Sequence, residues 1–167
     1  MTTPYIPTVE TQMLVRRPVQ LVFQAFIDPT VTTHFWFTKS SGQLEIDKKV
    51  IWEWEMYNIS TQVFVREIVE DKKIVIEWGD PLTTVEFLFE PQTNNTTYVV
   101  IKSYGFTQTG QELIEVIKDN TGGFTTVLDS LKAFLEHGLK LNLIADKFPQ
   151  HHNSTEKNFG KWQKAKK

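Results

Sequence analysis

The sequence contains no cysteine among its 167 residues. This absence excludes disulfide bonds, thiolate metal sites and cysteine nucleophiles, and it fits a reducing compartment, so we expect a cytoplasmic location. No segment approaches the roughly 18 consecutive apolar residues that a membrane-spanning helix requires. The N-terminus also has no basic region followed by an apolar run. We therefore expect neither a membrane span nor a secretion signal.

Sequence signatures of catalysis are missing as well. There is no glycine-rich phosphate loop, no nucleophile elbow, and no histidine pair at the spacing of a helical metal site. His151 and His152 are adjacent and would point apart on a helix or strand, so we predict neither a metal nor a cofactor. His34 could act as a polar anchor or an acid, but a lone histidine is more often structural. The sequence thus favours a binding protein over an enzyme.

Charge is unevenly distributed along the chain. The formal net charge is −2, yet residues 151–167 contain five lysines and one glutamate, which leaves the rest acidic. An acidic body argues against a nucleic-acid partner. We predict one domain over residues 1–150 and a basic, solvated tail over residues 151–167. Phe159 and Trp162 leave open the alternative that this tail docks on the domain or on a partner.

Hydrophobic periodicity predicts one helix near the start, a run of strands and a helical end. Residues 9–15 read as a strand, 19–27 as a helix that Asp28 and Pro29 end, and 30–37 as a short helix or turn. Six further strands are expected at residues 43–46, 49–57, 61–69, 73–78, 84–90 and 97–104. Helical segments are expected at residues 111–118 and 124–137, with a break or bend at Gly122 and Gly123.

Alternation along the strands identifies the side chains that face inward. Trp52 and Trp54 share one face of their strand, whereas Glu53 and Glu55 share the other. The same rule groups further inward residues, namely Val50, Met56, Ile74, Ile76, Trp78, Val85, Phe87, Phe89, Val99, Ile101 and Ser103. A sheet lined in this way must be covered, and the apolar face of residues 124–137 is the element best suited to cover it.

Several tryptophans on one inner surface favour an apolar ligand pocket with few polar anchors. Packing in an ordinary core is the alternative for each ring. At Trp54 the two interpretations differ in how much Trp54→Ala lowers the free energy of unfolding. A core position should lose ~3 to 5 kcal/mol, and a hydrated pocket should lose under ~2 kcal/mol. We expect the smaller loss. The predicted ligand-binding residues are Trp36, Trp52, Trp54, Trp78, Phe87, Ser103, Phe124 and Leu128.

Two groups of segments carry a resemblance to a known family. The first is the opening unit RRPVQLVFQAFIDP at 16–29, followed by HFWF at 34–37 and VIWEWE at 50–55. The second is TVEFLFEP at 84–91, SYGF at 103–106 and the closing GGF and VLDSLKAFLEHG between 122 and 138. In this order they resemble the START-like (helix-grip, SRPBCC) superfamily, and within it the bacterial homologues of the heat-shock-protein-90 ATPase activator. The resemblance covers residues 9–138, and residues 139–148 continue partly apolar and could pack back on the domain.

The resemblance implies an α+β helix-grip fold, in which a curved antiparallel sheet wraps around a long C-terminal helix. It also implies a cavity between sheet and helix that binds a small apolar molecule. Two alternatives remain open: a co-chaperone-like interaction that stimulates the heat-shock-protein-90 ATPase, and a cyclase or hydrolase that uses His34. A cavity of ~300 Å³ or more would favour the ligand, whereas a filled core with an exposed apolar patch would favour a protein partner.

Overall fold

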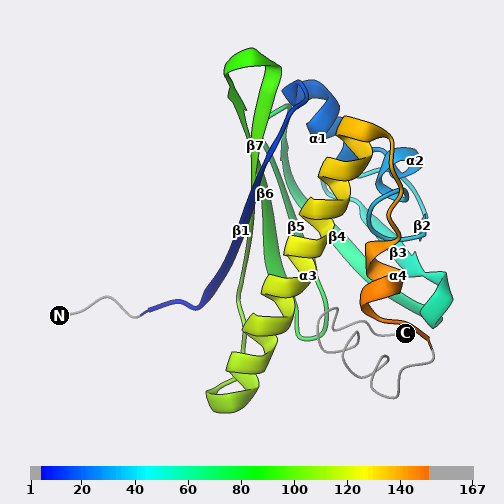
Figure 1. The fold of residues 1–167 in the computed structure, drawn as a ribbon. Helices are drawn as coiled ribbons and strands as arrows, with labels where there is room; N and C mark the ends of the chain where they lie inside the picture. The colour runs from blue at the N-terminus through cyan, green and yellow to red at the C-terminus, as the bar shows by residue number, and fades with distance from the viewer. Residues whose placement is uncertain (1–4, 151–167) are drawn as a thin grey trace.

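A seven-stranded antiparallel sheet forms one layer of the computed structural model, which describes residues 5–150 (Figure 1). Its strand order is β1-β7-β6-β5-β4-β3-β2, so the first strand lies beside the last. The strands are β1 (Thr8–Val15), β2 (Lys39–Ser40), β3 (Lys49–Trp54), β4 (Ile59–Val69), β5 (Lys73–Trp78), β6 (Thr83–Gln92) and β7 (Thr96–Tyr104). Strands β2 to β7 follow one another as a meander, whereas β1 pairs with β7.

Four helices and two short 3₁₀ turns complete the described chain. The helices are α1 (Val19–Ile27), α2 (Pro29–Thr32), α3 (Gly110–His137) and α4 (Leu143–Lys147), and the turns are η1 (Glu55–Tyr57) and η2 (Thr93–Asn95). The predicted bounds of α1 are confirmed. Asp28 ends α1 in an extended conformation, and its carboxylate accepts a hydrogen bond from the Thr30 amide at 2.9 Å, which caps α2. None of the helices in the described residues is long and apolar enough to cross a membrane.

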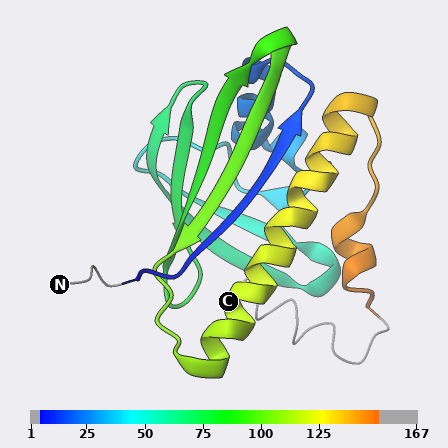
Figure 2. The same cartoon turned by 60° about the vertical axis from the view of Figure 1, so that its left-hand side comes forward.

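The long helix α3 lies across the concave face of the sheet (Figures 1 and 2). Phe124, Val127, Leu128 and Leu131 form its buried face. Its C-terminal end is tied to the sheet edge, because the Lys132 Nζ donates to the Leu14 carbonyl at 2.8 Å and the Arg17 Nε donates to the Leu135 carbonyl at 2.7 Å. This arrangement confirms the predicted α+β helix-grip fold.

Three predicted local features are wrong. Residues 43–46 are not a strand, since the Leu44 amide bonds the Ile27 carbonyl at 3.2 Å and its side chain enters the core. The strand expected to reach residue 57 ends at Trp54, because η1 and the left-handed Asn58 turn the chain. The helix does not break at Gly122 and Gly123; a helical glycine costs only about 1 kcal/mol relative to alanine, which burial of the adjoining apolar face offsets.

Inward alternation is otherwise confirmed, with Trp52 and Trp54 buried on β3 and Trp78 buried on β5. Asp129 and His137 are exposed on α3. The predicted basic tail, with its two histidines, Phe159 and Trp162, lies outside the described residues. The domain boundary at residue 150 therefore stays a prediction.

Candidate functional site

Aromatic rings fill the space between the sheet and α3. Trp36 lies at the centre of this cluster, with its ring centroid 4.9 Å from that of Trp52 and 5.9 Å from that of Trp78. Phe124 reaches it from α3 at 6.2 Å, and Phe87 reaches it from β6 at 5.9 Å. Edge and tilted contacts of this kind are those of a packed aromatic core. The centre of the grip is therefore occupied by the protein's own side chains.

All eight predicted ligand-binding residues are buried, and none is more than 4 % exposed. The structure brings five of them into mutual ring contact, namely Trp36, Trp52, Trp78, Phe87 and Phe124. Trp54 joins them through Phe37, whose ring centroid is 6.3 Å away, and Leu128 lies on the same buried face of α3 as Phe124. Whether these residues contact a ligand stays a prediction.

Ser103 lies apart from the aromatic rings, on β7 opposite Val9 of β1 and Val85 of β6. It is fully buried and faces inward, as the alternation predicted. Within residues 5–150 its hydroxyl oxygen has no hydrogen-bond partner. A buried hydroxyl without a partner is unusual in a folded protein.

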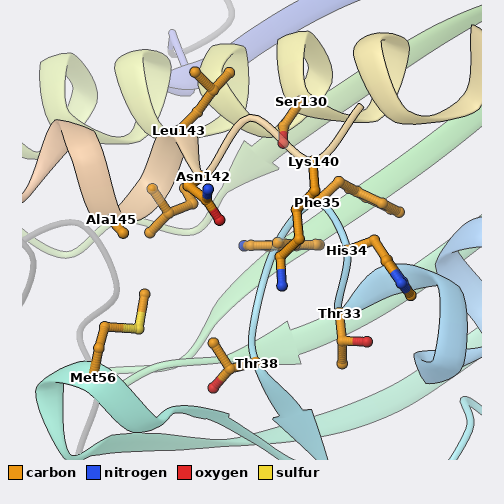
Figure 3. A pocket seen from close by; sticks show the side chains of 12 residues that line it. Thr33, His34, Phe35, Thr38, Met56, Ser130, Lys140, Asn142, Leu143 and Ala145 are labelled. Atoms are coloured by element: carbon orange, nitrogen blue, oxygen red, sulfur yellow. The ribbon is translucent and has the colours of Figure 1, made fainter. Parts of the chain in front are cut away.

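An open pocket of about 170 Å³ lies next to the aromatic cluster (Figure 3). Its walls come from the chain after α2, from η1, from the middle of α3 and from the segment that leads into α4. The lining residues are Thr33, His34, Phe35, Trp36, Thr38, Met56, Ser130, Lys140, Asn142, Leu143, Ile144 and Ala145. One of the eight predicted residues, Trp36, borders this pocket. His34, which the sequence suggested as a polar anchor, also lines it.

The turn after α2 builds one wall. The Thr32 hydroxyl donates to the Ala25 carbonyl at 2.6 Å, and the Trp36 amide donates to the Thr32 carbonyl at 2.9 Å. These bonds fix a tight turn that buries Phe35 and Trp36 and leaves His34 exposed. The imidazole of His34 stacks on Phe134 of α3, with ring centroids 4.6 Å apart and an angle of 17° between the planes. Turn and helix therefore meet at the edge of the pocket.

The opposite wall is the segment that follows α3. Gly138 ends α3 in the left-handed conformation, with φ 66°, so the chain reverses and runs back along the helix. Tyr57 holds this returning segment through its hydroxyl, which donates to the Phe148 carbonyl at 2.6 Å and lies 3.3 Å from the Ile144 carbonyl. Burial, followed by the negative charge of Asp146, raises the pKa of Tyr57 to about 12. The phenol consequently stays a neutral donor at physiological pH.

The polar groups of the pocket suit binding better than catalysis. As far as residues 5–150 form it, the lining includes one lysine, one asparagine, one serine and two threonines, but no carboxylate. Thr38 is already engaged, because its hydroxyl donates to the Glu53 carbonyl at 3.0 Å and accepts from the Glu55 amide at 2.9 Å. Within the described chain, no hydrogen bond joins His34 to a nucleophile or to a carboxylate. The arrangement can hold a molecule but does not assemble a nucleophile with its base.

Sequence reasoning missed most of the residues that line the pocket. The sequence indicated that residues 139–148 are partly apolar and could pack back on the domain. The structure confirms this packing, because α4 contacts α3. The sequence did not identify Lys140, Asn142 or Ala145 as site residues. Two features of the sequence could have located this segment. Gly138 is a typical helix stop, and the apolar run after it indicates a segment that packs back against α3.

Comparison with known proteins identifies relatives of this fold. The model of the family described as "Activator of Hsp90 ATPase homolog 1-like protein" matches residues 16–136. A protein from Staphylococcus saprophyticus is 27 % identical, with a TM-score of 0.72 over 81 % of this chain and 96 % of that chain. The Aha1 dimer from Colwellia psychrerythraea is 15 % identical, with a TM-score of 0.68 over 80 % of this chain and 98 % of that chain. A search of curated proteins gave no significant match.

Proposed function

We propose that this chain, which belongs to the Activator of Hsp90 ATPase homolog 1-like family, binds a small apolar molecule. The START-like domains of this family are of the ligand-binding or co-chaperone-like kind. The proposed site is the pocket between the turn after α2, the middle of α3 and the segment leading into α4. The observation that carries the proposal is this open pocket, which lies beside an aromatic cluster that is otherwise filled.

The volume of the pocket limits the size of the ligand. Drug-sized ligands occupy about 300 to 1,000 Å³, whereas a cavity of about 150 Å³ in another protein holds benzene. At about 170 Å³ the pocket fits a molecule with a single ring. This volume lies below the ~300 Å³ at which a cavity was expected to favour a ligand over a protein partner, so the pocket supports only a ligand of this small size.

The predicted aromatic residues take two roles in this proposal. Trp36 contacts the ligand directly, since it borders the pocket. Trp52, Trp78 and Phe124 support the Trp36 ring from behind through ring contacts. Trp54, Phe87 and Leu128 would reach a ligand only if it entered the aromatic cluster, which the ligand we propose does not need to do. Ser103 lies apart from these rings and takes no part in the proposed site.

The alternative is a co-chaperone-like protein interaction. The filled interior favours it, because a grip packed with its own aromatic rings has less need of an internal ligand. The family description also points in that direction. A cyclase or hydrolase that uses His34 has less support, because its exposed ring is stacked on Phe134 and no hydrogen bond within residues 5–150 prepares it for proton transfer.

Filling the pocket should abolish ligand binding. Ala145 lines the pocket from α4, so the Ala145→Phe variant places a ring where the ligand would lie. In a titration with one-ring compounds, followed by tryptophan fluorescence and melting temperature, we expect wild type to respond and Ala145→Phe to bind at least about tenfold more weakly.

The matched control is Lys147→Phe, which adds the same ring to the same helix at an exposed position outside the pocket lining. This variant should bind like wild type. If no compound of the panel shifts the tryptophan fluorescence or the melting temperature of wild type, the ligand-binding proposal fails. The co-chaperone alternative then gains support. If Ala145→Phe binds as well as wild type, the ligand lies elsewhere.

A further inference from the structure

Among the described residues that line the pocket, Lys140 carries the one side chain with a permanent charge. Its side chain extends from the segment between α3 and α4 into the space that the lining encloses (Figure 3). Within residues 5–150 its ammonium group forms no ion pair, whereas Lys39, Lys73 and Lys132 each lie within 4 Å of a carboxylate. The pocket therefore carries a positive charge that the described chain does not neutralise.

A buried hydroxyl faces the same space. Ser130 is only 3 % exposed, and its hydroxyl points from α3 into the pocket (Figure 3). Hydroxyl side chains inside helices commonly donate to the carbonyl four residues earlier. Thr125 and Thr126 of the same helix do so at 2.7 and 2.8 Å, but the Ser130 hydroxyl makes no such bond and no other within the described residues. The Ser130 hydroxyl is therefore available to a ligand or to water at the surface of the pocket.

A third donor belongs to Trp36. Its indole nitrogen is buried and has no hydrogen-bond partner within the part of the chain that the structure describes. An indole N–H and an ammonium group can only donate, and the Ser130 hydroxyl is free to donate. The pocket thus combines apolar walls with a positive charge and with donors that lack a partner within the described residues. A ligand that complements it must bring acceptor atoms and a negative charge.

We propose that the ligand is a small monocyclic carboxylate, an inference that rests on the proposed function of the pocket. Its ring packs against Phe35, Trp36 and Leu143, and its carboxylate accepts hydrogen bonds from the Lys140 ammonium and the Ser130 hydroxyl. Hydrogen bonds between charged partners are roughly twice as strong as neutral ones. Because Lys140 is exposed, this contact remains sensitive to salt. The carboxylate therefore determines the affinity of the ligand, and the volume around the ring limits the size of the ligand.

The test compares ligands of one shape and different charge. Phenylacetate, phenylacetamide and phenethylamine are titrated into the full chain by calorimetry at low and high salt. We expect phenylacetate to bind at least about tenfold more tightly than phenylacetamide. Its affinity should fall as salt rises, because salt screens the charged contact. Phenethylamine should bind most weakly.

Two variants identify the groups responsible. Lys140→Met keeps an apolar stem but removes the charge, so it should abolish the preference for phenylacetate over phenylacetamide. Ser130→Ala should weaken phenylacetate binding while leaving the melting temperature near that of wild type. The control Lys147→Met removes the same charge from an exposed residue outside the pocket lining and should leave the preference intact.

The outcomes separate this inference from the proposed function. If phenylacetate and phenylacetamide bind equally in wild type, or if Lys140→Met retains the preference, the carboxylate inference is overturned while small-molecule binding stands. If none of the three compounds binds and the wider one-ring panel also fails, the proposed function itself is wrong. A preference that Lys147→Met abolishes as fully as Lys140→Met would reflect overall charge and would also overturn the inference.

Discussion

Trp54→Ala is expected to lower the free energy of unfolding by about 3 to 5 kcal/mol, the range for truncating a large buried aromatic side chain. Trp54 is fully buried at the end of β3, where its ring meets Phe37 edge to face. Truncation removes these contacts and leaves a void that the rigid sheet cannot close. Urea unfolding of the variant beside wild type measures the difference.

Ile51→Ala is the matched control, because Ile51 lies on the same strand with its side chain outward and 39 % exposed. It should cost less than about 1 kcal/mol. A cost below about 2 kcal/mol for Trp54→Ala would mean that water already reaches the ring. That is the hydrated pocket that the sequence alone favoured, and it would contradict the packing described here.

Trp36→Ala should have two large effects at once. The ring contacts six others, those of Phe26, Phe37, Trp52, Trp78, Phe87 and Phe124. Its loss should therefore cost about 3 to 5 kcal/mol of stability. Because Trp36 also borders the pocket, the space it leaves should join the pocket and admit a second ring. We expect naphthoate to raise the melting temperature of Trp36→Ala but not that of wild type.

The control for this gain is Trp54→Ala, which removes the same ring at a position that does not line the pocket. Naphthoate should not stabilise that variant. If naphthoate stabilises wild type as strongly as Trp36→Ala, Trp36 does not limit the size of the pocket. The proposed direct contact between Trp36 and the ligand would then be wrong.

The sequence was sufficient for β1, for β4 to β7 and for α1, because alternation and the Asp28-Pro29 stop are local signals. It was insufficient at Gly122 and Gly123, where burial of a long apolar face outweighs the modest helix penalty of glycine. Inward placement of the tryptophans followed from period-two alternation. Whether inward rings leave a void depends on how side chains from distant segments fill volume, which no strand pattern encodes.

The pocket wall shows the same limit at longer range. Tyr57 and Phe148 are 91 positions apart in the chain, yet their hydrogen bond fixes the returning segment that carries Lys140 and Ala145. Such a pairing has no signature in either segment. The apolar residues after Gly138 indicated that the chain could pack back on the domain, but not which residues it would place over Ser130.

The most direct test of the account is a nuclear magnetic resonance titration of the full chain with phenylacetate, observing backbone amide and indole N–H signals. The account predicts saturable shifts at Ser130, Lys140, Leu143 and the indole of Trp36, with little change at Val75 and Leu88 on the outer face of the sheet. Shifts confined to the outer face, or no shifts at millimolar ligand, would contradict the claim that this pocket binds a small monocyclic carboxylate.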